Sequence, residues 1–530
     1  LEQWTSDLPV TADRGDITDT NGIVFASSGT SYTVYVRPNS VSNHSLVAEL
    51  LSQALKLSYQ DVYDKVTAKI SENTIKRKIT VEEANLIRSY NLEGVYLAAD
   101  TSREYVYGDF LSQVLGFVSS DNTGQSGLEA YYDKYLRGVD GAILTPSDLV
   151  GKELEGESAY YTPPVSGLNV VTTIDFRIQR VVENVLDLVM QGHSPKGARC
   201  IVVNPQTGEV LAMSSKPSVD LNNLPRDNIG ELMASTKNML ITDVYEPGST
   251  FKVLTAAAML EEYARGNPKA HSASYVFPNN ANFRIVDGSR VKCWTTHTSS
   301  KHCNQNLGDA LNNSCNPIFT DIGLSLGKET MYKYLSAFGY GAVSGIDFAG
   351  EQAGLLVAES AVTNGDLARI SFGQTIAVTP LQLAMATSAA VNGGLLLQPY
   401  LVKEIRTQEG ELVKKFYPTV RQRAISEKVS RELAGLLENV VTNGSGKQAY
   451  IEGFKVGGKT GTAQKYENGH IAVGKYVSSF VGFFPADNPQ YLALMLVDEP
   501  TGAHYGSTVA APYAKMIFQQ IINYKNLKPA

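Results

Sequence analysis

The segment Glu246-Pro247-Gly248-Ser249-Thr250-Phe251-Lys252, followed by an uncharged run from Val253 to Leu260, organises our interpretation of this 530-residue chain. Its Pro-Gly pair is a turn, and the Ala, Leu and Met residues that follow favour a helix beginning near Ser249. A spacing of three residues puts Ser249 and Lys252 on one face of that helix. The apolar turns behind them predict burial, which favours the neutral form of a lysine. A neutral Lys252 can take the proton of Ser249, so the segment predicts a serine nucleophile with a lysine base.

A Ser-x-x-Lys pattern by itself is weak, because it is expected by chance about once or twice in a chain of this length. Ser325-Leu326-Gly327-Lys328 is a second match, and we assign no chemistry to it. Hydrophobic residues make up 43% of the chain and charged residues 19%, which is typical of globular domains. The net charge of −7, without a long basic run, argues against a nucleic-acid partner.

The longest uncharged run extends from Ile370 to Val402 and has to be weighed as a membrane span. It contains Pro380, a Gly393-Gly394 pair and several amides, so we predict a buried loop and helix instead. The chain shows no signal peptide at Leu1, and we expect any membrane anchor to lie outside it.

Residues 1–165 read as a module of their own, with no acid pair or Cys/His set at catalytic spacing. The stretch Pro163-Pro164-Val165-Ser166-Gly167 marks a boundary. After it we predict a helix capped by Asp175 and a hairpin around residues 205–208. Strands are predicted at 454–464, 477–485 and 491–497, and a terminal helix at 510–524. This order of elements predicts an α+β domain over residues 166–530 rather than a parallel α/β sheet.

Two further patterns follow the Ser249 segment, namely Ser314-x-Asn316 and Lys459-Thr460-Gly461. Placed on a helix start, a loop and a strand, the three patterns resemble the acyl-transfer motifs of penicillin-binding proteins and class A β-lactamases. Cys315 stands where the second motif usually has Asp, and its side chain need not face the site.

The resemblance extends over nearly the whole chain. Arg14-Gly15-Asp16-Ile17-Thr18-Asp19 and Gly127-Leu128-Glu129 resemble the N-terminal pedestal of class B penicillin-binding proteins. Gly373-Gln374 and the segment Gly457 to Gln464 resemble their transpeptidase domain. Within that class the chain looks most like the sporulation and division type. The resemblance implies a mainly β or extended pedestal of the dimerisation type (1–165). It also implies a transpeptidase domain with an antiparallel sheet packed by helices (166–530).

The family implies a D,D-transpeptidase that cross-links peptidoglycan through an acyl-enzyme on Ser249 and is acylated there by β-lactams. Lys252 would then be the base, Ser314 would relay a proton to the leaving amine, and Lys459 would hold the local charge. Asn316 would bind the substrate amide. The Lys459-Thr460-Gly461 motif, continued to Thr462, would receive the terminal carboxylate, with Thr460 and Thr462 as its contacts. The resemblance assigns the two oxyanion donors to the backbone N–H groups of Ser249 and Thr462.

Three of the four cysteines cluster shortly before and within the Ser314 motif. Thiolate and imidazole are the usual ligands of zinc, so Cys293, His297, His302 and Cys303 predict a structural zinc site. Asp287 can replace His297 in this set, and Cys315 is a further candidate. A Cys293–Cys303 disulfide and buried free thiols are the competing interpretations. The zinc would brace the loop that leads to Ser314, because a serine enzyme needs no metal-activated water.

Other functions fit parts of the pattern. A β-lactam sensor or a catalytically silent scaffold of the wall-synthesis complex would keep the same domains. A serine β-lactamase or D,D-carboxypeptidase would not need the large pedestal, and no obvious deacylating Glu is present. The expected partners are stem peptides ending in D-Ala-D-Ala, β-lactams and a glycan polymerase in the membrane. We expect the protein at the outer face of the bacterial cell membrane.

Overall fold

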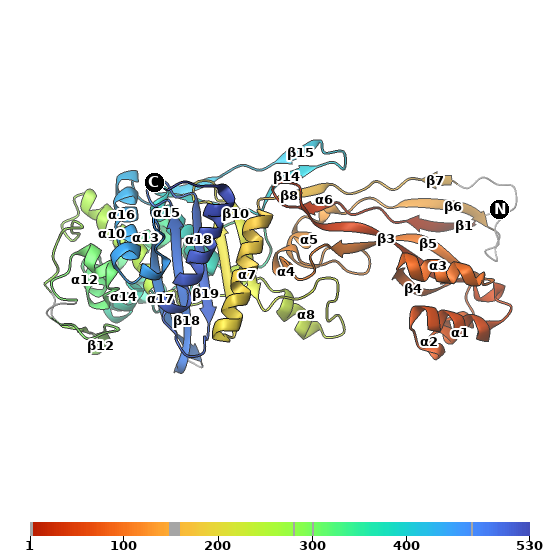
Figure 1. Cartoon of the computed structure of the whole chain (residues 1–530), viewed down its shortest axis with the longest axis horizontal. Helices are drawn as coiled ribbons and strands as arrows, with labels where there is room; N and C mark the ends of the chain where they lie inside the picture. The colour runs from red at the N-terminus through yellow and green to blue at the C-terminus, as the bar shows by residue number, and fades with distance from the viewer. Residues whose placement is uncertain (1–3, 148–159, 279–280, 299–301, 468–469, 530) are drawn as a thin grey trace.

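The structure, a computed structural model, describes residues 4–147, 160–278, 281–298, 302–467 and 470–529. The molecule is elongated, with the N-terminal part at one end of its long axis and the C-terminal part at the other (Figure 1). The N-terminal part contains the strands β1 (Trp4–Val10), β2 (Ile17–Thr18), β3 (Val24–Val36), β4 (Asn73–Ile79), β5 (Val95–Tyr105), β6 (Gly141–Ser147) and β7 (Tyr160–Thr162). Its helices are α1 (His44–Leu55), α2 (Tyr59–Val66), α3 (Val81–Tyr90), α4 (Ser112–Leu115), α5 (Gly127–Tyr131) and α6 (Asp133–Leu136).

The C-terminal part contains β8 (Asn169–Thr172), β9 (Gly197–Val203), β10 (Val210–Lys216), β11 (Phe283–Val286), β12 (Ser289–Lys292), β13 (Leu395–Leu397), β14 (Val402–Arg406), β15 (Leu412–Lys415), β16 (Val420–Arg423), β17 (Gly457–Glu467), β18 (His470–Phe484) and β19 (Tyr491–Asp498). Its helices are α7 (Phe176–His193), α8 (Ile229–Thr236), α9 (Met239–Thr242), α10 (Lys252–Ala264), α11 (Leu307–Asn312), α12 (Asn316–Leu326), α13 (Lys328–Ala337), α14 (Asn364–Ile370), α15 (Pro380–Val391), α16 (Glu427–Asn443), α17 (Gly506–Val509) and α18 (Ala511–Lys525). A 3-10 turn, η2 (Gly248–Phe251), precedes α10.

The C-terminal part is built on an antiparallel five-stranded sheet with the order β10-β9-β19-β18-β17. One face packs on α7 and α18, and the other face joins the large core that includes α10, α12 and α15. The side chain of Asp175 caps α7 by accepting hydrogen bonds from the N–H groups of Arg177 and Ile178, as predicted. This arrangement confirms the predicted α+β fold, and β17 lies at the edge of the sheet.

Several predicted elements have different ends in the structure. The predicted strand at 477–485 belongs to a longer strand, β18, and the predicted strand at 454–464 begins at Gly457 and continues to Glu467. The uncharged run around α15 is a buried loop and helix, as predicted, since every residue of α15 is buried. Among the described helices, none combines the length and the apolar character that crossing a membrane requires.

A second sheet passes through the predicted boundary at residues 165 and 166. Its order is β15-β14-β8-β2-β3-β4, with β5 also paired to β3. β8 lies parallel to β2, with Ile17 opposite Val170, and antiparallel to β14. The N-terminal and C-terminal parts of the chain are therefore joined by continuous strand pairing, and not only by a peptide linker.

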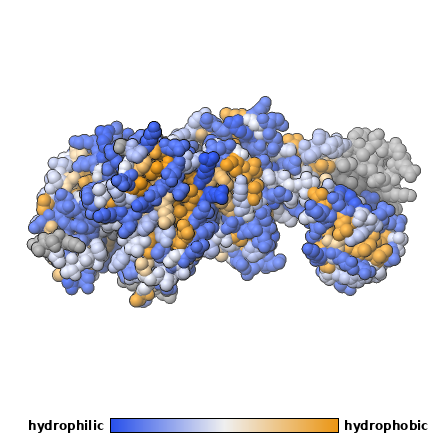
Figure 2. All heavy atoms as spheres, viewed as in Figure 1, coloured by the Kyte–Doolittle hydropathy of each residue, from blue (hydrophilic) through white to orange (hydrophobic). Residues whose placement is uncertain are grey.

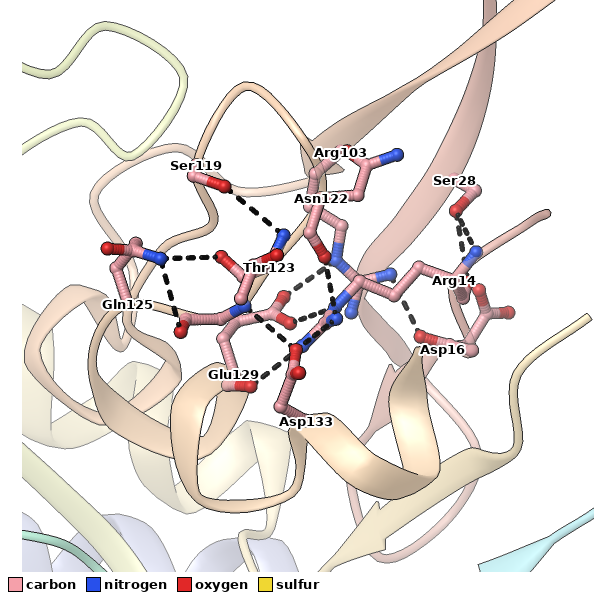
Figure 3. A network of polar contacts seen from close by, with 12 residues as sticks. Arg14, Asp16, Ser28, Arg103, Ser119, Asn122, Thr123, Gln125, Glu129 and Asp133 are labelled. Atoms are coloured by element: carbon pink, nitrogen blue, oxygen red, sulfur yellow. Dashed lines mark hydrogen bonds and ion pairs between the residues drawn. The ribbon is translucent and has the colours of Figure 1, made fainter. Parts of the chain in front are cut away.

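The two pedestal motifs meet in a buried cluster of charges (Figure 3). Arg14 Nε lies 2.6 Å from Glu129 Oε2, and Arg103 Nε lies 2.6 Å from Glu129 Oε1. Arg14 Nη1 also pairs with Asp133 Oδ1 at 2.6 Å. The Glu129 side chain is fully buried, and both arginine side chains are only 2% exposed. Gly15 lies beside this cluster, where a Cβ atom would sit 1.9 Å from the carbonyl oxygen of Leu168.

Helices α1, α2 and α3 form a lobe with its own small core at the far end of the pedestal. This lobe exposes Leu46, Val81 and Leu86, and Figure 2 shows hydrophobic residues gathered on it. The surface of the rest of the visible face is mostly hydrophilic.

Candidate active site

The Ser249 segment forms a tight turn before a buried helix. Gly248 has a φ of 56°, and its N–H donates to the carbonyl oxygen of Gly373 at 2.9 Å. A Cβ atom on Gly373 would lie 2.1 Å from the carbonyl oxygen of Gly248, so only glycine fits there. The 3-10 turn η2 carries Ser249, and α10 begins at Lys252. The helix start near Ser249 is as predicted.

Lys252 lies at the centre of the hydrogen-bond network of the site. Its side chain is fully buried, and Nζ lies 3.0 Å from Ser249 Oγ and 3.0 Å from Ser314 Oγ. Nζ also lies 2.8 Å from the carbonyl oxygen of Ser314 and 2.7 Å from Asn316 Oδ1.

These four neighbours limit what Lys252 can do. The carbonyl oxygen of Ser314 and Oδ1 of Asn316 can only accept hydrogen bonds, so they take two of the hydrogens on Nζ. The third position on nitrogen faces the two serine hydroxyls. In the neutral amine this position is a lone pair, and a hydroxyl can donate into it. The geometry is therefore compatible with proton transfer from Ser249 to Lys252.

Ser314 lies between two buried lysines. Lys459 Nζ approaches Ser314 Oγ to 3.1 Å, opposite the 3.0 Å contact from Lys252. Ser314 has a φ of 52°, an uncommon left-handed conformation for a residue with a Cβ atom. Strained backbone of this kind persists where the surrounding structure holds it, and it is frequent at functional sites. The Ser314 hydroxyl is thus in reach of both amines.

Burial changes the titration of both lysines. It lowers the pKa of Lys252 to about 8, and the nearby Cys293 and Cys315 sulfurs oppose the shift. Burial also lowers the pKa of Lys459 far below its usual value, and the positive charge of Lys252 adds to this effect. Two like charges that share one serine hydroxyl cannot both persist in a buried site, so at least one amine is neutral near neutral pH.

We predict that the rate of acylation by penicillin rises with pH and levels off above about pH 8. A base acts in its deprotonated form, so a pKa of about 8 gives about a tenfold rise between pH 7 and pH 9. A lysine with an ordinary pKa would give a rise of about a hundredfold without a plateau. Stopped-flow acylation across this range, with penicillin stability and circular dichroism checked at each pH, measures the difference. A flat profile would contradict the base role.

The Lys459-Thr460-Gly461 motif lies on β17, the edge strand of the sheet, beside the η2 turn. Gly461 is required by this packing, because a Cβ atom would lie 2.4 Å from Ser479 Oγ and 2.9 Å from Thr250 Cγ2. Thr462 is partly exposed, and its hydroxyl oxygen accepts a hydrogen bond from the N–H of Gly506 at 3.1 Å. An edge strand has backbone groups free of sheet pairing, which can bind a peptide-like substrate.

The structure adds two residues that sequence reasoning did not single out. Thr460 Oγ1 lies 3.1 Å from Ser445 Oγ, at the end of α16. Gly506 begins α17 and contacts Thr462. Residues 443–446, Asn-Gly-Ser-Gly, are typical of the end of a helix, and nothing in the local sequence around Ser445 or Gly506 indicates a site.

The Cys/His cluster is close to Ser314, but its fourth member differs from our prediction. The ligand atoms of Cys293, His297, His302 and Cys315 all lie within 4.8 Å of one another. Cys303 is not in this group, so the structure does not bring the predicted Cys303 to the cluster, and Cys315, the further candidate, lies there instead. All four cysteines of the chain are free thiols, which excludes the Cys293–Cys303 disulfide from this structure.

Asp287 also lies outside this group, and its Oδ2 accepts a hydrogen bond from the N–H of Gly365 at 2.7 Å. The hydrogen bond between the two clustered sulfurs lowers the pKa of Cys293 and raises that of Cys315. The cluster is tied directly to the Ser314 motif, since Cys315 is the middle residue of that motif.

These contacts define an acyl-transfer site with a Ser-Lys pair, a second serine and a Lys-Thr-Gly edge strand. The "Penicillin binding protein transpeptidase domain" family matches residues 198–522, and the "Penicillin-binding Protein dimerisation domain" family matches residues 9–172. The chain belongs to the penicillin-binding proteins, in class B, which combines these two domains.

Among individual proteins, the chain is 40% identical to "Stage V sporulation protein D" of Bacillus subtilis (strain 168), across 100% of this chain and 81% of that protein. It is 27% identical to "Peptidoglycan D,D-transpeptidase FtsI" of Escherichia coli (strain K12), across 98% of this chain and 85% of that protein.

Solved structures share the fold. A peptidoglycan synthetase from Bifidobacterium adolescentis superposes with a TM-score of 0.79 at 24% identity, covering 99% of this chain and 98% of that one. Penicillin binding protein 3 from Mycobacterium tuberculosis, complexed with aztreonam, gives a TM-score of 0.74 at 22% identity, covering 99% of this chain and 98% of that one.

Proposed function

We propose that this chain is a serine D,D-transpeptidase that cross-links the stem peptides of peptidoglycan and is acylated by β-lactams at Ser249. The observation that carries the proposal is the position of Lys252 Nζ, 3.0 Å from both Ser249 Oγ and Ser314 Oγ. The names of its relatives, which are peptidoglycan D,D-transpeptidases, support the substrate class.

In the proposed reaction, Lys252 Nζ takes the hydroxyl proton of Ser249 while Ser249 Oγ attacks the carbonyl carbon of the penultimate D-Ala. The developing oxyanion is bound by the N–H groups of Ser249 and Thr462, each worth roughly 3 kcal/mol by analogy with other acyl transferases. The C–N bond to the terminal D-Ala then breaks, and its nitrogen receives a proton through the Ser314 hydroxyl. Lys459 balances charge beside Ser314, and an amine of a second stem peptide attacks the acyl-enzyme and frees Ser249.

Substrate contacts follow the same motifs. Asn316 is partly exposed, and its Nδ2 donates to the carbonyl oxygen of Lys292 at 3.1 Å, which orients the side chain beside the nucleophile. We assign it to the substrate amide. Thr460 and Thr462 are assigned to the terminal carboxylate, with Gly461 giving the close approach of β17 to η2.

The decisive experiment is intact mass spectrometry after incubation with penicillin, on the wild type and on Ser249→Ala. We expect one stable adduct on the wild type and none on the variant, because Ser249 is the assigned nucleophile, whereas Ser314, which also contacts Lys252, is assigned to relaying the proton. Rapid loss of the adduct would indicate a β-lactamase, and no adduct on the wild type would favour a silent scaffold.

A second assay separates a transpeptidase from a β-lactam sensor. A donor peptide ending in D-Ala-D-Ala is incubated with an amine acceptor, and both released D-Ala and the cross-linked product are measured. A transpeptidase forms the product, whereas a sensor is acylated by penicillin without forming it and a carboxypeptidase releases D-Ala without it.

The biological setting is proposed from the substrate and the relatives. Peptidoglycan lies outside the cytoplasmic membrane, which places the catalytic domain at the outer face of that membrane. A glycan polymerase in the membrane is the expected partner, because a cross-linking enzyme needs new strands. Similarity to "Stage V sporulation protein D" and to FtsI supports a role in sporulation or division.

We also propose that Cys293, His297, His302 and Cys315 hold a structural zinc ion. Two thiolates and two imidazoles are a common ligand set for closed tetrahedral sites. In a regular tetrahedron around zinc, a sulfur and a nitrogen ligand are about 3.6 Å apart. Cys293 Sγ and His302 Nδ1 are 3.7 Å apart, and Cys315 Sγ and His297 Nε2 are 3.8 Å apart. The residues present therefore fit the ion.

Such an ion would brace the Ser314 motif and take no part in the chemistry. It would connect Cys315, between Ser314 and Asn316, to the loop after β12. Lys292, the last residue of β12 and directly before Cys293, provides the carbonyl oxygen that orients Asn316. Closed coordination by four protein ligands leaves no position for an activated water.

Elemental analysis is expected to give one zinc per chain, and chelation is expected to lower the melting temperature. Cys315→Ser and His302→Ala should each lose the metal. Cys303→Ser is the matched control, because Cys303 neighbours the cluster in sequence but lies outside it, and it should keep the metal. Metal-free protein with an unchanged melting temperature after chelation would contradict the site, as would loss of zinc in Cys303→Ser.

A further inference from the structure

A cleft of about 640 Å³ lies between the pedestal and the catalytic domain. One wall comes from α5 and α6 of the pedestal, and the other from β15 and the residues after it. Figure 1 shows the β14–β15 hairpin extending from the catalytic domain over the pedestal near α6. The cleft uses none of the residues assigned to acyl transfer.

Aromatic side chains dominate this cleft. They account for six of its thirteen lining residues, although aromatic residues make up only 9% of the chain. The six are Tyr131, Tyr132, Tyr135, Tyr400, Phe416 and Tyr417. Such enrichment indicates a surface built for a ligand with flat apolar faces.

Some of the aromatic rings of the cleft are buried and pack on one another, whereas others are exposed to solvent. Tyr132 is buried and packs edge-on against Phe416 across the domain junction, at a centroid distance of 6.3 Å. Tyr131 is 46% exposed and Tyr417 is 67% exposed, one from each wall. Exposed tyrosines with both an apolar ring and a hydroxyl are suited to ligands that are partly apolar and rich in hydroxyl groups.

The charge of the cleft is positive in a chain whose net charge is −7. Lys134, Lys414 and Lys415 line it, and Asp347 is its one acidic lining residue. Asp347 is occupied internally, since it accepts hydrogen bonds from the Tyr132 hydroxyl and from the N–H groups of Leu401 and Val402. Burial raises the pKa of Asp347.

The lysines are largely free to bind an external anion. Lys415 lies 3.8 Å from Glu404. Lys134 and Lys414 form no ion pair with any residue that the structure describes. Each lies over a neighbouring ring instead, Lys134 at 4.9 Å from Tyr135 and Lys414 at 4.8 Å from Phe416. Amines held beside ring faces provide a carboxylate site next to a stacking surface.

We propose that this cleft binds the glycan chain of peptidoglycan. The C–H faces of pyranose rings would stack on Tyr131 and Tyr417. The carboxylates of the lactyl groups or stem peptides would pair with Lys134 and Lys414. The inference rests on the proposed function, because cross-linking brings this polymer to the protein. A glycan bound at the junction holds a strand on the same body as Ser249, which raises the local concentration of its stem peptides.

The test measures binding of peptide-free glycan strands to the full chain carrying Ser249→Ala, by isothermal titration calorimetry at two salt concentrations. The double variant Tyr131→Ala/Tyr417→Ala should weaken binding at least tenfold. Lys134→Gln/Lys414→Gln should weaken it and reduce its dependence on salt. The matched control is Tyr161→Ala, which removes a 60% exposed tyrosine outside the cleft and should leave binding unchanged. Circular dichroism checks the fold of each variant.

Three outcomes would overturn the inference. These are absence of glycan binding by the parent protein, equal weakening by Tyr161→Ala, and tighter binding of poly(glycerol phosphate) or a free acidic peptide than of glycan. The same cleft substitutions, introduced with Ser249 intact, should leave the rate of acylation by penicillin within twofold of the wild type. Failure of acylation in the wild type would refute the proposed function. The binding measurement does not depend on acylation, so the two failures can be told apart.

Discussion

Replacing Lys252 by alanine is expected to lower the rate of acylation by penicillin about 10³-fold, the usual scale of general-base catalysis. The variant removes the one amine within hydrogen-bonding distance of Ser249 Oγ among the residues that the structure describes. It also leaves the Ser314 carbonyl oxygen and Asn316 Oδ1 without their shared donor, so the positions of Ser314 and Asn316 are less well fixed. The residual rate should lose the pH dependence around pH 8.

A fluorescent penicillin followed by stopped flow measures this effect. The matched control is Lys328→Ala, which removes the lysine of the second Ser-x-x-Lys match. Lys328 begins α13 and makes none of the contacts of the site, so its loss should leave acylation unchanged. A wild-type rate in Lys252→Ala would refute the assignment of the base.

Replacing Glu129 by alanine is expected to destabilise the protein by about 3 to 5 kcal/mol, the usual cost of leaving buried charges unpaired. Arg14 and Arg103 both use this carboxylate, at 2.6 Å, and all three side chains are buried. In the variant, Asp133 still neutralises Arg14 (Figure 3), but Arg103 keeps only its hydrogen bond to the carbonyl oxygen of Gly15 among the contacts of the described residues. Urea unfolding followed by circular dichroism gives the change in the free energy of unfolding.

Two comparisons make the result specific. Glu129→Gln keeps the shape of the side chain and removes its charge, so its loss of unfolding free energy should be close to that of Glu129→Ala. Glu427→Ala breaks an exposed pair with Arg431, whose side chains are 70% and 73% exposed, and should have a far smaller effect. Equal losses from Glu129→Ala and Glu427→Ala would show that the buried cluster does not stabilise the pedestal.

The sequence was sufficient to predict the residues that meet at the site. Ser249, Lys252, Ser314, Asn316 and Lys459 lie in three separate segments, and the structure brings all five together. Each segment has a local signal for its backbone structure, namely a turn before an apolar helix, a polar loop or a strand between glycines, but each motif is weak by itself. Their assembly came from the family resemblance, because nothing in the local pattern relates residues so far apart in the chain.

The fourth member of the Cys/His cluster shows where local spacing fails. Cys303 adjoins His302, and adjacency suggested that both side chains join the cluster. Neighbouring residues in non-helical backbone point in different directions, and His302 itself has a φ of 62°. Cys315 reaches the cluster by tertiary packing, since it is the N-cap residue of α12. Distance along the chain was therefore a poor guide to distance in space.

The pairing of β8 with β2 was also beyond prediction. These short parallel strands are separated by about 150 residues, and β2 contains only two residues. A strand this short has no alternating pattern from which to infer a partner. The sheet that crosses the predicted domain boundary is for this reason visible only in three dimensions.

We expect that shared sheet to resist bending of the molecule at the junction, because bending there would break hydrogen bonds between paired strands. In Figure 1 the α1–α3 lobe lies near one end of the axis and the α12 region near the other, with hydrogen-bonded strands spanning the junction. The junction is a set of paired strands and not a single linker. We therefore expect a displacement of the α1–α3 lobe to move the whole molecule, including Ser249. We then expect the distance between the α1–α3 lobe and Ser249 to stay nearly constant.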